Sequence, residues 1–455
     1  MDSFLFQEFD AVSASQWKQK IQFDLKGADY NKTLLTKTLE GITIRPFYHS
    51  DDYEKLTIPN LNSDFLICQT IYVSDEKKAS ALAIDALVRG AQSINFIIPK
   101  AINNKLLLQS VIDQFPTAEL HFQFEFLDEN YISTLHHFLI EQKTYFNIDI
   151  IGNLAATGNW FFNLKKDHEI LNKLYDISSK NNCLIGVNAS LYQNAGANNV
   201  QQIAYALAHA NEYLNHFGAA VASKVQFQFA IGSHYFMEIA KLRAFRYLWD
   251  ILLKEYQTTA PAIIFAEPTL RNKTLFDYNT NLLRATTECM SAVLGGITTI
   301  SNVSYDRIYK HRNEFGERIA RNQLLILKEE SNFKKADTIA ENSYYIETLT
   351  KQLAEKALTL FKEIEKGGGF LNQLKDGIIQ RKIQESAKKE QELFNANEII
   401  LLGTNKYPNP QDHMKAAVEI YPFLRKKSRK TLLPTIIPHR LSESYEQNRL
   451  SHEKA

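Results

Sequence analysis

Three residues have side chains suited to acid–base or anion chemistry, and each lies near the end of a short β-rich run. His234 comes after Gly232-Ser233, and Glu267 and Arg271 mark the end of a later run. Histidine and carboxylate groups are the usual general acids and bases, and an arginine guanidinium pairs with carboxylate or phosphate. One hypothesis is therefore an enzyme centred on these residues, if the fold brings them together. In the competing interpretation His234 caps the helix that follows it, and Glu267 and Arg271 form only a surface ion pair.

Sequence patterns typical of metal and phosphate sites are missing. The histidines at 136 and 137, and those at 209 and 216, lack the i, i+4 spacing that places two zinc ligands on one helix face. The glycine-containing stretch 152–158 lacks the G-x-G-x-x-G spacing. The three cysteines are too far apart for a disulfide framework or a zinc site: Cys68, Cys183 and Cys289. We therefore expect no metal site, and reduced thiols in the core.

The elements that must position these residues alternate between β-rich runs and longer helical patterns. Such alternation predicts βα units and a parallel sheet. The spacing between successive runs leaves room for a crossover helix each time, so we predict a closed (β/α)8 TIM barrel. The eight predicted strands are residues 64–73, 93–99, 118–126, 147–152, 183–189, 224–231, 262–267 and 297–303.

The barrel is predicted to carry additions at both ends. Residues 1–55 are expected to form an N-terminal arm, residues 56–405 the barrel with added C-terminal helices, and residues 406–455 a proline-rich, extended tail. An apolar stripe from Ile346 to Ile364 predicts one added helix, which Gly367 ends. A second long helix is predicted over 370–394.

Charge and hydropathy exclude several classes of function. Lys and Arg number 52 and Asp and Glu 51, so no net field attracts polyanions, and nucleic-acid binding is not expected. No stretch stays apolar for the roughly 20 residues that a membrane span requires. The first ten residues carry acids where a signal peptide needs basic residues. A cytoplasmic protein without a membrane or nucleic-acid partner is the expectation.

Several segments resemble the methylmalonyl-CoA mutase family, in the family's order and approximate spacing. The longest is 230–249, which includes F-M-E-I-A-K-L-R-A. Shorter matches are E-R-I-A-R-N at 317–322, S-Y-Y-I-E at 343–347 and N-K-Y at 405–407. The resemblance implies a (β/α)8 barrel, whereas the separate cobalamin domain that follows the barrel in the family is expected to be missing from this chain. Catalytic members interconvert methylmalonyl-CoA and succinyl-CoA with adenosylcobalamin radicals.

Departures from the family pattern suggest that this chain has lost catalysis. Leu191 occupies the place of an active-site histidine, and Lys224 replaces an arginine of the substrate site. A tyrosine-containing segment before the first strand is missing, and the D-x-H-x-x-G signature of cobalamin binding occurs nowhere. The resemblance therefore implies a small, non-catalytic subunit that holds no cobalamin and forms a heterodimer with a large subunit carrying adenosylcobalamin. The alternative is a barrel that itself binds acyl-CoA, or catalyses with a cobalamin domain supplied in trans.

The alternation of two strands makes a prediction about the barrel interior. Polar residues alternate with phenylalanines over 119–126 and 226–229. Because crossover helices cover the outside of a barrel, the phenylalanines should face outward and the polar residues inward. Catalytic relatives thread the pantetheine arm of the substrate through this lumen. We expect it to be filled here by His121, Gln123, Glu125, Gln226 and Gln228.

Overall fold

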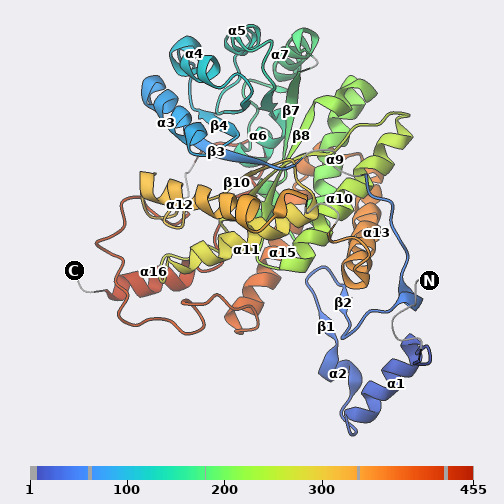
Figure 1. Cartoon of the computed structure of the whole chain (residues 1–455). Coiled ribbons are helices and arrows are strands. Elements are labelled where there is room, and N and C mark those ends of the chain that lie inside the picture. Colours follow the sequence, from blue (N-terminus) through green and yellow to red (C-terminus); the bar gives the residue numbers. More distant parts are fainter. Residues whose placement is uncertain (1–7, 60–63, 180, 336–338, 425–428, 454–455) are drawn as a thin grey trace.

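The computed structural model describes residues 8–59, 64–179, 181–335, 339–424 and 429–453. The parts of the predicted arm, barrel and tail at other positions lie outside the described residues. Most of the chain surrounds one parallel barrel, with additions at both ends (Figure 1).

Eight parallel strands close into a barrel in the order β10-β3-β4-β5-β6-β7-β8-β9, which confirms the predicted TIM barrel. The strands are β3 (Leu66–Tyr72), β4 (Ser93–Ile98), β5 (Glu119–Phe124), β6 (Thr144–Ile148), β7 (Asn182–Asn188), β8 (Val225–Ile231), β9 (Ile263–Pro268) and β10 (Thr299–Ser301). At least one helix follows each strand: α3 (Glu76–Val88), α4 (Asn104–Gln114), α5 (Glu129–Phe138), α6 (Ile150–Thr157) with α7 (Leu164–Ile177), α8 (Ser190–Asn194) with α9 (Asn199–Phe217), α10 (Tyr235–Glu255), α11 (Thr280–Gly295) and α12 (Glu314–Leu325).

Aromatic residues of the strands pack outward against this helical layer. Phe227 and Phe229 on β8 contact Phe245 of α10, with ring centroids 4.6 and 4.8 Å apart. Phe122 on β5 lies between Phe96 and Phe146 of the neighbouring strands, 5.9 Å from each. Large rings on the helix-facing side leave the opposite side of the same strands for polar residues.

The predicted fourth strand, 147–152, is wrong in position. The strand is β6, which ends at Ile148, and residues 150–157 form helix α6. Asp149 ends the strand because its carboxylate accepts a hydrogen bond from the Gly152 amide at 2.7 Å and caps the helix. Asn147, with a φ of 48°, lies within the irregular β6–β7 register. A helix cap thus interrupts a run whose composition alone predicts a strand.

Two further helices lie beyond the barrel units. Helix α13 (Tyr344–Lys366) packs against α9 and α10, and its extent agrees with the predicted apolar stripe. The second predicted helix is divided into α14 (Phe370–Lys375) and α15 (Ile378–Asn395). Gly377 separates them with a φ of 71°, a left-handed conformation that glycine adopts without strain.

The N-terminal arm contains α1 (Ala14–Asp24), α2 (Tyr30–Leu34), and the antiparallel strands β1 (Thr36–Lys37) and β2 (Thr43–Ile44). Figure 1 shows α1 and α2 standing away from the barrel. The end of the chain is only partly extended, because α16 (Glu443–His452) interrupts the predicted tail. Ahead of α16, residues 431–441 run without regular structure; we call them the C-terminal strap.

Candidate functional site at the barrel mouth

The carboxyl ends of the strands form a mouth that contains two cavities. One, of about 560 Å³, lies at the ends of β5 to β8 and is lined by several amide side chains, among them Gln123, Asn147, Asn188 and Gln228. The other, of about 440 Å³, lies at the ends of β7 to β9, between residues 36–40 of the arm and α15. Both occupy the end of the barrel where enzymes of this fold place their sites.

Asp149 forms part of the first cavity's wall and is the centre of a buried hydrogen-bond network. It accepts hydrogen bonds from the Asn188 amide at 3.0 Å, the Tyr213 hydroxyl at 2.9 Å and His209 Nε2 at 2.9 Å. Burial raises the pKa of Asp149, but the charge and hydrogen bonds of His209 and the backbone amides lower it more, so the net direction is down. With its oxygens engaged, this carboxylate fixes the loops of the mouth and is not available as a base.

A buried lysine lies behind the second cavity. Lys241 on α10 is fully buried and pairs with Glu238 at 2.5 Å. Its Nζ also donates to Gln202 Oε1 at 2.8 Å and to the Ala230 carbonyl at 2.9 Å. Burial lowers the pKa of Lys241, and Glu238 partly reverses that shift. The ammonium group therefore joins α10 to β8 and α9 and is not a free nucleophile.

The three candidate residues of the hypothetical enzyme site do not converge. His234 and Arg271 both line the second cavity, whereas Glu267 does not. His234 occupies the N-cap position of α10 and is exposed, but its side chain makes no capping bond. The ion pair of the competing interpretation, between Glu267 and Arg271, does not form, because Arg271 instead pairs with Glu390 of α15 at 2.7 Å. Burial raises the pKa of Glu267, and the charges of two other arginines oppose that rise: Arg307 and Arg312.

Lys224 does not belong to the mouth, which corrects its predicted location. It immediately precedes β8, at the opposite end of the barrel. Its Nζ donates to the Ser178 and Ser179 carbonyl oxygens at 3.0 and 3.1 Å. Leu191 does lie at the mouth, on α8, where it is 7% exposed and packs in the hydrophobic core. An aliphatic side chain there can neither transfer a proton nor donate a hydrogen bond.

Three aromatic rings in contact with one another cross the barrel axis. His121 on β5 lies parallel to Tyr145 on β6, with centroids 4.2 Å apart, and meets the edge of Phe265 on β9 at 5.2 Å. Strands β5 and β9 are four positions apart in the ring of eight, so this contact joins opposite walls. His121 Nδ1 is 3.2 Å from Gln226 Oε1, and both residues are fully buried. Burial lowers the pKa of His121 to about 3, so the ring is neutral.

The other three residues expected to fill the lumen lie further out. Gln123, Glu125 and Gln228 line the first cavity of the mouth, and Glu125 is exposed. Sequence reasoning missed Tyr145, which precedes the predicted fourth strand, and Phe265, which alternates with outward residues of β9. The alternation of inward and outward positions along β9 could have identified Phe265 as a lumen residue. Identifying Tyr145 required the correct boundary of the fourth strand.

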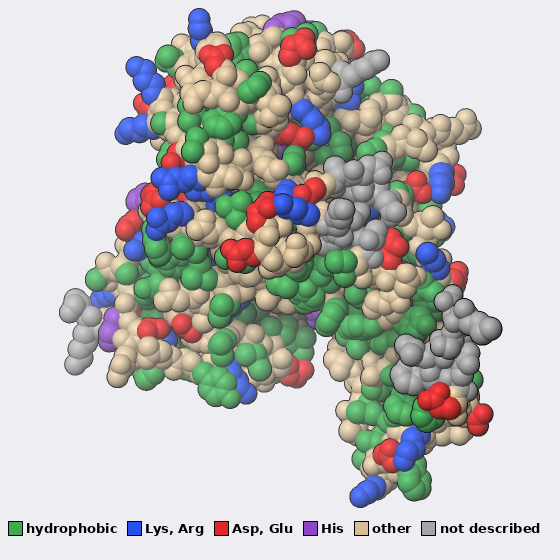
Figure 2. Space-filling model, viewed as in Figure 1, with side chains coloured by type: hydrophobic (Ala, Val, Ile, Leu, Met, Phe, Trp, Pro, Cys, Tyr) green, Lys and Arg blue, Asp and Glu red, His purple; other side chains and the backbone are tan. Residues whose placement is uncertain are grey.

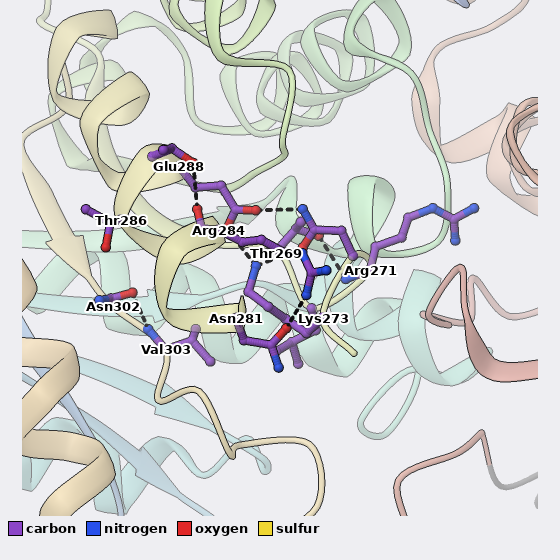
Figure 3. Close-up of polar contacts among 12 residues, drawn as sticks. Thr269, Arg271, Lys273, Asn281, Arg284, Thr286, Glu288, Asn302 and Val303 are labelled. Carbon is purple, nitrogen blue, oxygen red and sulfur yellow. Dashed lines mark hydrogen bonds and ion pairs between the residues drawn. The ribbon is translucent and has the colours of Figure 1, made fainter. Parts of the chain in front are cut away.

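A dense polar network holds the loop after β9 against α11 (Figure 3). Lys273 pairs with Glu288 at 2.7 Å, and both side chains are buried. Arg284 donates to Thr274 Oγ1 and Asn281 Oδ1, each at 2.8 Å. The network is internally paired, so it acts as structural support for the mouth.

The C-terminal strap crosses this mouth and is bound by main-chain hydrogen bonds. The Leu432 and Ile436 amides donate to the Gly158 and Ala155 carbonyls, each at 2.9 Å. Further on, the His439 amide donates to the Asn194 carbonyl at 3.1 Å and the Leu441 amide to the Arg271 carbonyl at 2.8 Å. These four acceptors follow β6, β7 and β9, so the strap covers that side of the mouth.

Two further features of the described residues bear on function. No group of three or more His, Cys, Asp or Glu residues is placed to hold a metal ion within the described ranges. None of the helices in that part of the chain combines the length and the apolar character needed to cross a membrane.

The closed barrel and the position of its cavities define a (β/α)8 protein with its candidate site at the carboxyl-terminal mouth. The family model for methylmalonyl-CoA mutase matches residues 141–447. Because that match spans more than half of the sequence, the chain belongs to the methylmalonyl-CoA mutase family. Members of this family are isomerases that use cobalamin.

Similar proteins include both kinds of mutase subunit. The methylmalonyl-CoA mutase small subunit of Porphyromonas gingivalis is 32% identical over 445 residues, which cover 89% of this chain and 71% of that one. The large subunit of the same organism is 29% identical over 60% of this chain and 40% of its own length. Methylmalonyl-CoA mutase of Cereibacter sphaeroides is 36% identical over 49% of this chain and 33% of its own length.

Proposed function

We propose that this chain is the small, non-catalytic subunit of a methylmalonyl-CoA mutase and forms a heterodimer with a large subunit that carries adenosylcobalamin. The observation that carries the proposal is the ring stack across the barrel axis. Catalytic relatives thread the pantetheine arm of the substrate along that axis. Here the rings of Tyr145, His121 and Phe265 lie across that axis and join β6 and β5 to the opposite strand β9, where they would obstruct such a chain.

The chemistry of the mouth supports the same conclusion. Leu191 lies where the resemblance places a histidine, and loss of one positioned acid or base typically costs a factor of about 10² to 10⁴ in rate. The carboxylate of Asp149 and the ammonium group of Lys241 are both engaged in buried networks. Neither of these two groups is thus free to replace the missing histidine.

The mouth is also a poor fit for cobalamin. Cavities of about 300 to 1,000 Å³ hold drug-sized ligands. The two cavities here, of about 560 and 440 Å³, are at the lower end of that range, and a corrinoid is several times bulkier than such a ligand. The strap supplies its own main-chain bonds to the same face. We therefore place the cofactor in the partner subunit and derive no catalytic step in this chain.

The N-terminal arm is the surface best suited to a partner subunit. Helix α1 has no buried residue, and Trp17 and Phe23 are 47% and 78% exposed. Exposed aromatic side chains grouped on a projecting element are typical of protein interfaces. The resemblance to the small subunit also extends over more of the chain than the resemblance to the large subunit.

Co-expression with the large-subunit homologue of the same genome tests the pairing. We expect a 1:1 complex in size-exclusion chromatography with light scattering. Phe23→Ala should weaken that complex by about tenfold or more if the ring is a central contact. Phe162→Ala, at a 54% exposed ring on the barrel, is the matched control and should leave the affinity unchanged. A chain that stays monomeric with micromolar large subunit present would refute the pairing.

A second experiment separates this proposal from the alternative of an acyl-CoA-binding or catalytic barrel. The purified chain, with and without Leu191→His, is mixed with adenosylcobalamin and methylmalonyl-CoA. We expect neither co-eluting cobalamin absorbance nor turnover in either form, because the axis stays closed when the histidine is restored. Saturable binding of methylmalonyl-CoA to the isolated chain would instead support the alternative.

A further inference from the structure

A third large cavity lies outside the barrel axis, between β3, α3 and α12. Its volume is about 640 Å³, and the loop 307–313 and Ile420 border its outer edge. Ile71, Leu82 and Ala86 provide an apolar wall. Five basic residues and three carboxylates complete the lining: Arg307, Lys310, Arg312, Arg318 and Arg321, with Asp85, Glu314 and Glu317. Figure 2 shows basic and acidic side chains gathered where α12 meets α3.

Two of these arginines, the buried Arg321 and the half-buried Arg312, each have a buried Nε atom without a hydrogen bond. Arg321 is 6% exposed, and its Nη1 donates to Gln69 Oε1 at 2.9 Å, but its buried Nε has no acceptor. The Nη1 of Arg312 donates to a main-chain carbonyl of β3, while its buried Nε has no hydrogen bond. Glu317 Oε1 is 3.9 Å from that Nε, which is too long for a hydrogen bond. A buried guanidinium donor left in this state costs free energy that an anion would recover.

The three carboxylates of the cavity only partly neutralise its five basic residues: Glu317 lies 3.9 Å from Arg312 and also accepts a hydrogen bond from Gln69. Asp85 pairs at 2.7 Å with Arg89, which does not line the cavity. Glu314 is 61% exposed and only 3.7 Å from Arg318 at its nearest. Among the described residues, Arg307 forms no ion pair. The cavity therefore combines a positive edge with an apolar wall.

We propose that the α3–α12 cavity binds a small organic anion with an apolar body. Its oxyanion head, a carboxylate or phosphate, would accept hydrogen bonds from Arg307, Arg312 and Arg321. Its apolar body would lie along Ile71, Leu82 and Ala86. The volume is that of an ordinary small-molecule site. This site is separate from the barrel axis and does not depend on the pairing proposed above.

Calorimetry on the full chain with dodecanoate and dodecyl phosphate, below their critical micelle concentrations, tests the site. We expect saturable 1:1 binding of at least one of them, and the better binder identifies the head group. Dodecanamide, which has the same chain without the charge, should bind at least about tenfold more weakly, because charge-assisted hydrogen bonds are lost.

Two matched variants decide whether the cavity is the binding site. Arg307→Gln removes one positive charge from the edge and should weaken dodecanoate or dodecyl phosphate binding about tenfold or more. Arg381→Gln makes the same change at a 63% exposed position on α15 and should have no effect. Thermal unfolding should be unchanged in both. The proposal would be overturned by absence of saturable binding, by equal binding of dodecanamide, or by equal losses of affinity in the two variants. It would also be overturned if the cavity were occupied only by an acidic segment of the large subunit.

Discussion

The barrel axis and the α3–α12 cavity both contain buried polar atoms that have no hydrogen bond, yet the two regions differ in the space around those atoms. On the axis, His121 Nε2 and Gln226 Nε2 have no hydrogen bond. In the cavity the same is true of Arg312 Nε and Arg321 Nε. The axis is crossed by rings in contact, whereas the cavity keeps about 640 Å³ of space beside its guanidinium groups.

This difference separates a structural polar residue from a binding residue. An unsatisfied buried donor or acceptor costs about 1 to 3 kcal/mol in either place. Stacking and edge-to-face ring contacts offset that cost on the axis, where no ligand can enter. In the cavity the open space lets an acceptor from solution, such as an anionic ligand, reach these donors. A buried polar side chain therefore indicates a binding site only where there is also open space for a ligand beside it.

The largest expected effect comes from removing a ring of the axis. Phe265→Ala should lower the free energy of unfolding by about 3 to 5 kcal/mol, because the ring is 2% exposed and its neighbours span the barrel. Urea denaturation measures this change. Phe315→Ala, at a 51% exposed ring on α12, is the control and should stay within about 0.5 kcal/mol. A small effect at Phe265 would mean that the axis is not closed by packed rings.

Acid should destabilise the axis through His121. The pKa of this ring is lowered to about 3 by burial, with a smaller contribution from Lys143, so the unfolded chain binds its proton more readily than the folded one. The neutral ring's contribution is fully present above about pH 6.5 and is lost as the pH falls toward 3, with a total of roughly 5 kcal/mol.

Urea unfolding at pH 7 and pH 4.5 measures this dependence. In His121→Phe the loss of stability between the two pH values should be smaller than in the parent chain. His413→Gln, at an exposed histidine, should behave like the parent. The idea fails if His121→Phe keeps the full acid sensitivity.

The sequence predicts the barrel well because strand and helix patterns are local. It places the fourth strand wrongly because a single cap, Asp149, overrides the β-rich composition around it. It predicts which faces of β5 and β8 are polar, but not that Tyr145 and Phe265 complete the crossing.

Contacts between distant segments explain what the sequence could not predict. Arg271 meets Glu390, 119 residues further along the chain, so its partner cannot be read from spacing. The α3–α12 cavity likewise depends on how two elements from opposite ends of the barrel sequence pack together. Its arginines follow β10, and two of them, Arg318 and Arg321, lie within E-R-I-A-R-N, a segment that resembles the family but carries no signal of a cavity.

The smallest expected effects come from enlarging one side chain inside the barrel and one beside the α3–α12 cavity. A Cβ added to Gly186 on β7 would lie 3.0 Å from the Asn147 backbone, which must shift, so Gly186→Ala should cost about 1 to 3 kcal/mol. Ala86 is 2% exposed but borders the cavity, so part of the longer side chain in Ala86→Leu can extend into it, and the substitution should cost less than Gly186→Ala. Leucine also suits the helix, and its side chain takes space from the proposed ligand, so dodecanoate binding should weaken while the protein stays folded. Equal destabilisation by the two substitutions in urea would show that the cavity is packed as tightly as the barrel, and the distinction between the two regions would be lost.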